Sequence, residues 1–152
     1  MKKITIYIFL FFAISLNAQT VTVSETMTLR NDAAYHLLGN LKGNILLLRD
    51  RVTEFEVECY NQDLKKTWEK EIELDKRKPE MVGILPTQNH FTILYTHRIK
   101  GDIRLKAHKY DPAANLVDSL TVKDYGNVFY TPNIDIIRSE DKTKILAYYH
   151  EN

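Results

Sequence analysis

The chain has 152 residues, with 21 basic and 20 acidic side chains, a formal net charge of +1 and a single cysteine, Cys59. This even balance gives no electrostatic basis for binding nucleic acid or an anionic membrane surface. One cysteine excludes a disulfide within the chain and predicts a small buried side chain instead, while the length is sufficient for one domain with a hydrophobic core.

The first eighteen residues have the pattern of a cleavable signal peptide. Lys2 and Lys3 precede an apolar run over residues 4–16, and Asn17-Ala18-Gln19 follows it. As a signal helix, the run would be about 20 Å long, well short of the ~30 Å hydrocarbon core of a bilayer. We therefore expect residues 1–18 to be removed on export to the periplasm, the cell surface or the medium. The remaining 134 residues would have no membrane contact; a retained anchor or a buried strand is the alternative.

Residues 19–152 have the periodicity of β-strands. Over residues 53–60 three glutamates alternate with apolar residues, which predicts a strand with one wet and one buried face. The runs 45–48, 91–95 and 145–149 are apolar almost throughout, as is typical of strands buried on both faces. Gly, Pro, Asn and Asp separate the segments and supply the backbone angles of chain reversals. The pattern predicts an all-β chain of about ten antiparallel strands with almost no helix.

The order of these segments recurs along the chain. One unit of four predicted strands comprises residues 35–38, 45–49, 54–60 and 66–74, and the next comprises residues 81–85, 91–97, 103–110 and 116–122. Tyr60-Asn61 and Tyr110-Asp111 stand at matching places 50 residues apart. A third unit supplies only residues 134–137 and 144–149. Four antiparallel strands in about 45 to 50 residues is the period of a β-propeller blade.

Two short motifs resemble known propeller repeats. Residues 138–148 look like the first hairpin of WD-like repeats, where Ser-Pro-Asp-Gly-Lys-Lys precedes apolar residues; here Glu140 replaces the proline and Lys142 the glycine. Tyr60-Asn61 followed by Lys66-Thr67-Trp68 is similar to the turn before the outer strand in quinone-enzyme-type blades, without that family's glycine before the tryptophan. The resemblance covers about residues 33–150 and implies architecture rather than activity.

The chain is therefore predicted to form a partial β-propeller over residues 19–152, with about two blades and the first hairpin of a third. Closed propellers have about four to eight blades, whereas 134 residues provide fewer than three. The last strand would leave an open edge, which we expect to bind a partner through Lys144, Leu146, Tyr148 and Tyr149. The partner would be another protein chain or a second copy, unless the sequence is the front of a longer propeller gene.

No residue pattern predicts catalysis, a cofactor or a metal centre. His97 and His108 could approach each other across a hairpin, but no third metal ligand accompanies them. A catalytic acid needs burial to raise its pKa, whereas the glutamates of residues 54–58 and 69–73 occupy alternating, solvated positions. Neither a phosphate-binding loop nor a serine elbow is present in the sequence.

We therefore expect a non-enzymatic exported module that acts as a scaffold or an interaction surface. The alternative is a small lipocalin-like β-barrel that carries an apolar ligand, since eight or more antiparallel strands suffice to enclose one. The recurrence every 50 residues and the strands that are apolar on both sides disfavour the barrel. Part of a secreted hydrolase is a third hypothesis, because propellers often host active sites.

Overall fold

The computed structural model describes residues 21–26, 34–51, 54–75, 79–141 and 143–149. Every regular element in these ranges is a β-strand, so the predictions of an all-β chain and of about ten strands are confirmed. The predicted signal helix, residues 1–18, lies outside the described residues. Within the described part of the chain, there is no helix with the length and apolar character needed to cross a membrane.

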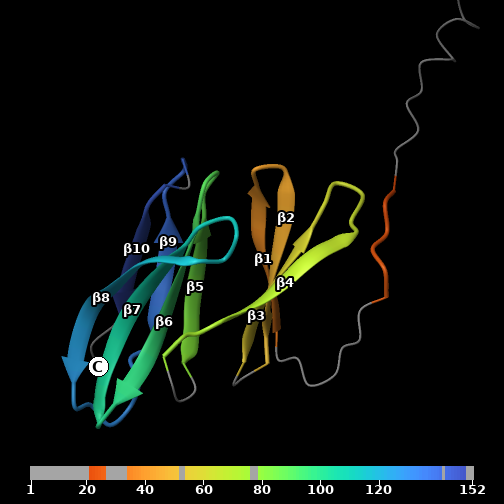
Figure 1. The fold of residues 1–152 in the computed structure, drawn as a ribbon. Helices are drawn as coiled ribbons and strands as arrows, with labels where there is room; N and C mark the ends of the chain where they lie inside the picture. Colours follow the sequence, from red (N-terminus) through yellow and green to blue (C-terminus); the bar gives the residue numbers. More distant parts are fainter. Residues whose placement is uncertain (1–20, 27–33, 52–53, 76–78, 142, 150–152) are drawn as a thin grey trace, which may run out of the picture.

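The strands form two four-stranded antiparallel sheets and one two-stranded hairpin (Figure 1). The first sheet consists of β1 (Ala34–Leu41), β2 (Asn44–Asp50), β3 (Phe55–Tyr60) and β4 (Lys66–Ile72). The second consists of β5 (Glu80–Pro86), β6 (Phe91–Ile99), β7 (Asp102–Tyr110) and β8 (Leu116–Gly126). The hairpin consists of β9 (Ile134–Arg138) and β10 (Ile145–Tyr149). Strands follow chain order in each sheet, so each predicted unit corresponds to one sheet.

The described strands do not form one closed sheet. β4 and β5 follow each other in the chain but belong to different sheets. A lipocalin-like barrel requires a single sheet in which pairing continues around the whole circumference. The alternative expectation of a barrel carrier therefore does not match the described part of the chain.

The turns that follow β3 and β7 are built in the same way. Asn61 Oδ1 accepts two backbone N–H groups of its own turn, at 3.0 and 2.9 Å, and Asp111 Oδ1 accepts two at 2.9 and 2.8 Å. Leu64 and Ala114, three residues further on, both have positive φ angles, 57° and 55°. A short Asn or Asp side chain stabilises such a reversal by replacing a backbone acceptor. The recurrence every 50 residues thus marks the same reversal in both sheets.

Each sheet has two distinct faces, because successive side chains of a strand point to opposite sides. We call the face of the first sheet with Ile45, Leu47 and Arg49 its front, and the face with Leu46 and Leu48 its back.

On the second sheet, the front face carries Phe91, Ile93 and Tyr95. The register supports this equivalence, because Phe91 pairs with Tyr110 as Ile45 pairs with Tyr60. The front and back faces of the two sheets can therefore be compared position by position.

The hydrophobic core lies between the back of the first sheet and the front of the second. One cluster of buried side chains contains Leu46 and Leu48 from the first sheet and Phe91 and Ile93 from the second, all 0% exposed. Cys59 belongs to the same cluster, so the prediction of a buried cysteine is confirmed. At about 25 cal/mol for each Å² of apolar surface removed from water, this burial is the main stabilising term in the fold.

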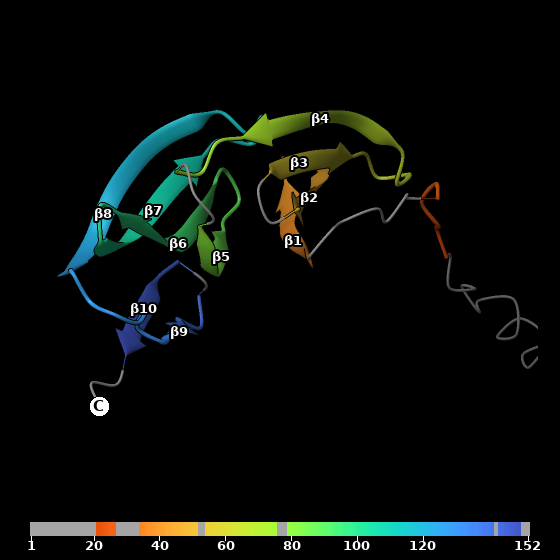
Figure 2. The same ribbon diagram turned by 90° about the horizontal axis from the view of Figure 1, so that it is seen from below.

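Glycines allow consecutive sheets to approach closely. A Cβ atom on Gly39 of β1 would lie 3.3 Å from Cβ of Pro86 in β5. On Gly83 of β5, it would overlap with Cδ1 of Ile136 in β9. Figure 2 shows the resulting fan, in which β1, β5 and β9 lie toward one side and β4 and β8 run along the opposite side.

Candidate functional site

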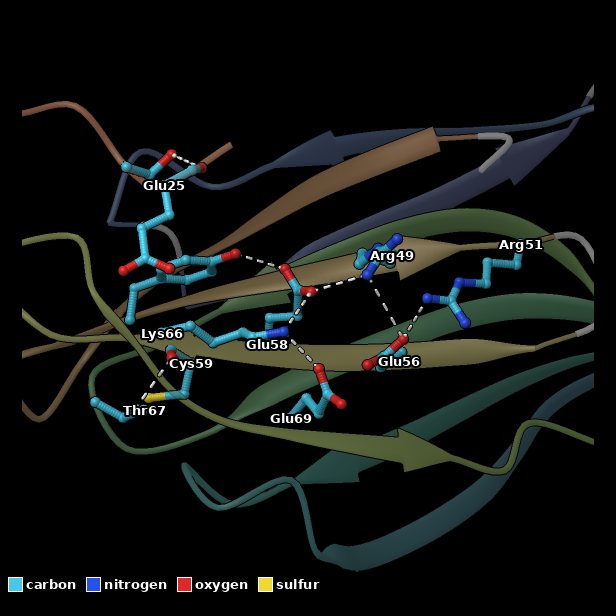
Figure 3. A network of polar contacts seen from close by, with 11 residues as sticks. Glu25, Arg49, Arg51, Glu56, Glu58, Cys59, Lys66, Thr67 and Glu69 are labelled. Carbon is cyan, nitrogen blue, oxygen red and sulfur yellow. Dashed lines mark hydrogen bonds and ion pairs between the residues drawn. The ribbon is translucent and has the colours of Figure 1, made fainter. Parts of the chain in front are cut away.

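A network of charged side chains lies on the front of the first sheet (Figure 3). Arg49 of β2 donates from Nη1 to Glu58 Oε1 of β3 at 2.9 Å, and the Tyr60 hydroxyl donates to Glu58 Oε2 at 2.7 Å. Glu58 is only 2% exposed and Arg49 only 9%. The prediction that the glutamates of residues 54–58 are solvated is therefore wrong for Glu58, because Arg49 and Tyr60 satisfy its carboxylate inside the protein.

Three carboxylates meet in this network. Oxygen atoms of Glu56, Glu58 and Glu69 all lie within 4.8 Å of one another, and carboxylate oxygens are ligands that Ca²⁺ and Mg²⁺ accept. Cations already surround them, however: Arg51 Nη2 lies 2.9 Å from Glu56 and Lys66 Nζ lies 2.6 Å from Glu69. Because these cations offset the negative charge, the arrangement acts as an ion-pair network that joins β2, β3 and β4.

The environment of these groups shifts their proton affinities in different directions. Burial raises the pKa of the Glu56 carboxyl, as does the nearby Glu69, while Arg51 opposes the shift. The hydrogen bond from Lys66 lowers the pKa of Glu69. Burial and the hydrogen bond to Glu58 raise the pKa of the Tyr60 hydroxyl, so Tyr60 remains a donor at neutral pH.

A second polar chain lies on the front of the second sheet. The Tyr95 hydroxyl donates to Asp75 Oδ2 at 2.8 Å and lies 2.8 Å from Nε2 of His108. Nδ1 of His108 is 3.3 Å from the Tyr110 hydroxyl, and Lys106 forms an ion pair with Asp75. Asp75 lies in the segment that connects β4 to β5. These contacts therefore fix this connecting segment against the second sheet.

The two histidines singled out from the sequence lie on this same face, but they do not meet. In the ladder between β6 and β7, His97 pairs with Arg104 and His108 pairs with Ile93, which places Tyr95 between the imidazoles. Both histidines and Asp75 line a cavity of about 600 Å³. Among the described residues, only the three glutamates of the first sheet come close enough to share a metal ion. The cavity therefore gathers titratable groups without bringing them into a ligand set.

Acidification from about pH 7.5 to about pH 5.5 is expected to destabilise the protein through His108. Burial lowers the pKa of His108, and Lys106 lowers it further, against the opposite effect of Asp75. In the unfolded chain, the imidazole of His108 has the ordinary histidine pKa of about 6.5. The unfolded chain therefore binds more protons in this pH range than the folded chain does. The stability contributed by neutral His108 is complete above about pH 6.5 and is lost as the pH falls, by up to about 1.4 kcal/mol per pH unit.

The loss can be measured by denaturant unfolding at both pH values. His108→Gln keeps an N–H donor toward Tyr95 but does not titrate, so its stability should depend less on pH than that of the wild type. His36→Gln, in the first sheet, controls for the removal of an imidazole elsewhere. An equal pH dependence in the wild type and in His108→Gln contradicts the expectation.

The four residues predicted for the partner-binding edge lie at the start of β10 and along it. Lys144 immediately precedes the strand and is exposed. Leu146 and Tyr148 point to the back of the hairpin, away from the second sheet, and are 62% and 36% exposed. Tyr149 points to the front, where its ring lies 5.2 Å from that of Tyr125 in β8. Leu146 and Tyr148 thus share an exposed apolar face, and the half-buried Tyr149 packs against Tyr125.

The sequence predictions did not include Arg49, Glu58 and Tyr60 as a cluster. The internal recurrence contained a signal for it. His108 and Tyr110 follow Glu58 and Tyr60 by 50 residues, so both units carry a polar residue two positions before the tyrosine that ends the third strand. A polar residue repeated at such a position indicates a buried network on the same face of each sheet.

These observations define a class of protein: an all-β chain of antiparallel four-stranded sheets, arranged side by side in chain order. No protein-family model, no curated protein and no solved structure matches the chain. Any functional assignment therefore depends on the sequence pattern and on the geometry of the described residues.

Proposed function

We propose that the chain is a non-enzymatic, exported interaction module, whose sheets are blade-like units of a β-propeller and whose β10 edge accepts a strand from a protein partner. One observation carries the proposal. β2 and β6 each pair with strands on both sides, whereas β10 pairs only with β9 among the described strands. Strand addition at such an edge provides backbone hydrogen bonds to a partner.

The repeated architecture supports the assignment of blades. Each four-stranded sheet is a meander whose strands follow chain order, and the sheets stack face to face in a fan. In β-propellers, sheets of this kind are arranged radially around an axis. β9 lies beside β5 as β5 lies beside β1, so β9 and β10 correspond to the first two strands of a further blade.

The polar clusters favour a structural role over catalysis. On the first sheet the carboxylates are held by arginine and lysine side chains, and on the second sheet Asp75 is held by Tyr95 and Lys106. These contacts join side chains of neighbouring strands and of the connection between the sheets, and a satisfied buried polar network of this kind rigidifies a fold. The signal-peptide pattern of residues 1–18 supports export.

A peptide with the sequence of β7 tests the proposal. β7 pairs with β6 over nine residues. β6 is the second strand of its sheet and β10 is the second strand of the hairpin, so a peptide with the sequence of β7 would be the third strand next to β10. A fluorescently labelled peptide Asp102–Tyr110 is expected to bind the protein saturably in an anisotropy titration. The absence of saturable binding contradicts strand addition.

Two methylated peptides provide matched controls. An N-methyl group on every second amide removes the donors along one edge of the peptide only, because successive amides point to opposite edges of a strand. One methylated set should abolish binding and the other should preserve it. Equal behaviour of the two sets would mean that the peptide binds through its side chains and not as an added strand.

A further inference from the structure

The interface between consecutive sheets occurs twice within the chain. The back of the first sheet covers the front of the second, and the back of the second sheet covers the front of the hairpin, where Gly83 meets Ile136. Both interfaces run head to tail, since a back face always meets a front face. The two outermost faces of this stack are one front face and one back face. Within the chain, a back face and a front face already pack against each other twice.

One outer face is the front of the first sheet. Leu37 pairs with Leu47 in the first sheet as Ile84 pairs with Ile93 in the second, so Leu37 and Ile84 hold equivalent positions. Leu37 is 67% exposed, whereas Ile84, which another sheet covers, is 5% exposed. Leu37 therefore lacks the cover that Ile84 has, whereas Arg49 and Glu58 on the same face are buried.

The other outer face is the back of the hairpin. Its apolar side chains are Ile137, Leu146 and Tyr148, and Ile137 and Leu146 are 54% and 62% exposed. On the back of the first sheet, Leu46 and Leu48 are 0% exposed because the second sheet covers them. The back of the hairpin is therefore an exposed apolar face. The equivalent face of the first sheet is covered by the front of the second sheet.

We propose that a second copy of the chain docks here, with the front of its first sheet on the back of the β9–β10 hairpin. The inference rests on the proposed stacking of blades, but it does not require the addition of a strand at the β10 edge. Charge does not oppose the contact: Arg49 and Glu58 are bonded to each other within the front face. Leu37 and Leu47 of one copy can then meet Ile137 and Leu146 of the other, while Arg49 and Glu58 keep each other as partners.

A contact of this kind is heterologous, because the two copies contribute different surfaces. Repetition of such a contact gives a closed ring or an open filament. Two single variants isolate the two surfaces: Leu37→Arg charges the front face and Leu146→Arg charges the hairpin. Both positions are exposed, so neither substitution disturbs the core of the protein.

Light scattering after size-exclusion chromatography measures the result. The purified wild-type protein should increase in mass with concentration, and each variant alone should require at least about tenfold more protein to associate. An equimolar mixture of the two variants should form a dimer and nothing larger, because each supplies one intact surface. Leu120→Arg, at an exposed leucine of β8, is the matched control and should assemble like the wild type.

Several outcomes overturn the inference. The first is a wild-type protein that stays monomeric up to about 100 µM, which is well above the dissociation constants of specific interfaces. The second is an assembly that neither variant weakens. The third is a mixture of the two variants that stays monomeric. If an arginine variant fails to fold, as judged by circular dichroism, Leu37→Ser and Ile137→Ser replace the pair. A monomer that still binds the β7 peptide would overturn only this inference, and an assembling protein that does not bind the peptide would overturn only the proposed strand addition.

Discussion

Replacement of Arg49 by methionine is expected to lower the free energy of unfolding by about 3 kcal/mol, because it leaves a carboxylate buried without its main cation. Glu58 is 2% exposed and receives the Arg49 guanidinium at 2.9 Å. Lys66 Nζ, 3.6 Å from the same carboxylate, remains as a partial substitute and keeps the loss at the lower end of the range of about 3 to 5 kcal/mol for broken buried pairs. Urea unfolding at neutral pH measures the change.

Two further variants separate the buried charge from general damage to the sheet. Arg51→Met removes the same kind of side chain from an ion pair with Glu56, but Arg51 is 32% exposed and should cost less than about 1 kcal/mol. Arg49→Met combined with Glu58→Gln removes both charges and should recover a large part of the loss. Equal losses for Arg49→Met and Arg51→Met, or no recovery in the double variant, would contradict the account.

Replacement of Gly83 by alanine is expected to lower the free energy of unfolding by about 1 to 3 kcal/mol, as is usual when a methyl group is forced into a filled space. The new Cβ atom would overlap with Cδ1 of Ile136, so the side chain of Ile136 or the whole hairpin has to move away from β5. Chemical denaturation measures the loss. We expect the added strain to fall on the contact between β5 and β9 rather than within either sheet.

A second substitution tests whether this overlap is the cause. Ile136→Val removes the Cδ1 atom, so Gly83→Ala should cost less in that background than in the wild type. Ile134→Val makes the same truncation on the same face of the hairpin, but away from Gly83, and should give no such relief. Additive losses in the Gly83→Ala, Ile136→Val pair would mean that the Cδ1 overlap does not determine the cost.

The sequence predicted the strands well because local signals define them. Lys42-Gly43 and Lys100-Gly101 fall in the gaps between predicted strands, where glycine indicates a reversal, and each of these four residues has the positive φ angle that such turns require. The turns at Asn61 and Asp111 were likewise recognised from residue type. Backbone geometry at a reversal depends on a few neighbouring residues, so it can be read from a short stretch of sequence.

The candidate site was harder to predict, because burial depends on partners far away in the chain. Alternation around Glu58 correctly placed it on the opposite face to Cys59, but it did not reveal that Arg49 pairs with it across the ladder. The same limit applies to Tyr149, whose ring packs against that of Tyr125, a contact between strands far apart in the chain. Strand register and the stacking of sheets determine both environments, and neither follows from periodicity alone.

The order of the strands also has a consequence for how the chain acquires its structure. Each sheet is assembled from one uninterrupted stretch of sequence, residues 34–72 and residues 80–126, and its strands pair with their immediate neighbours. Such short-range pairing keeps the entropy cost of loop closure small and favours rapid folding. A polypeptide that emerges gradually, from a ribosome or a translocation pore, can therefore complete its first sheet before the second has appeared. Until then, the apolar back of that sheet is exposed, and this is the stage at which a chaperone would protect it from aggregation.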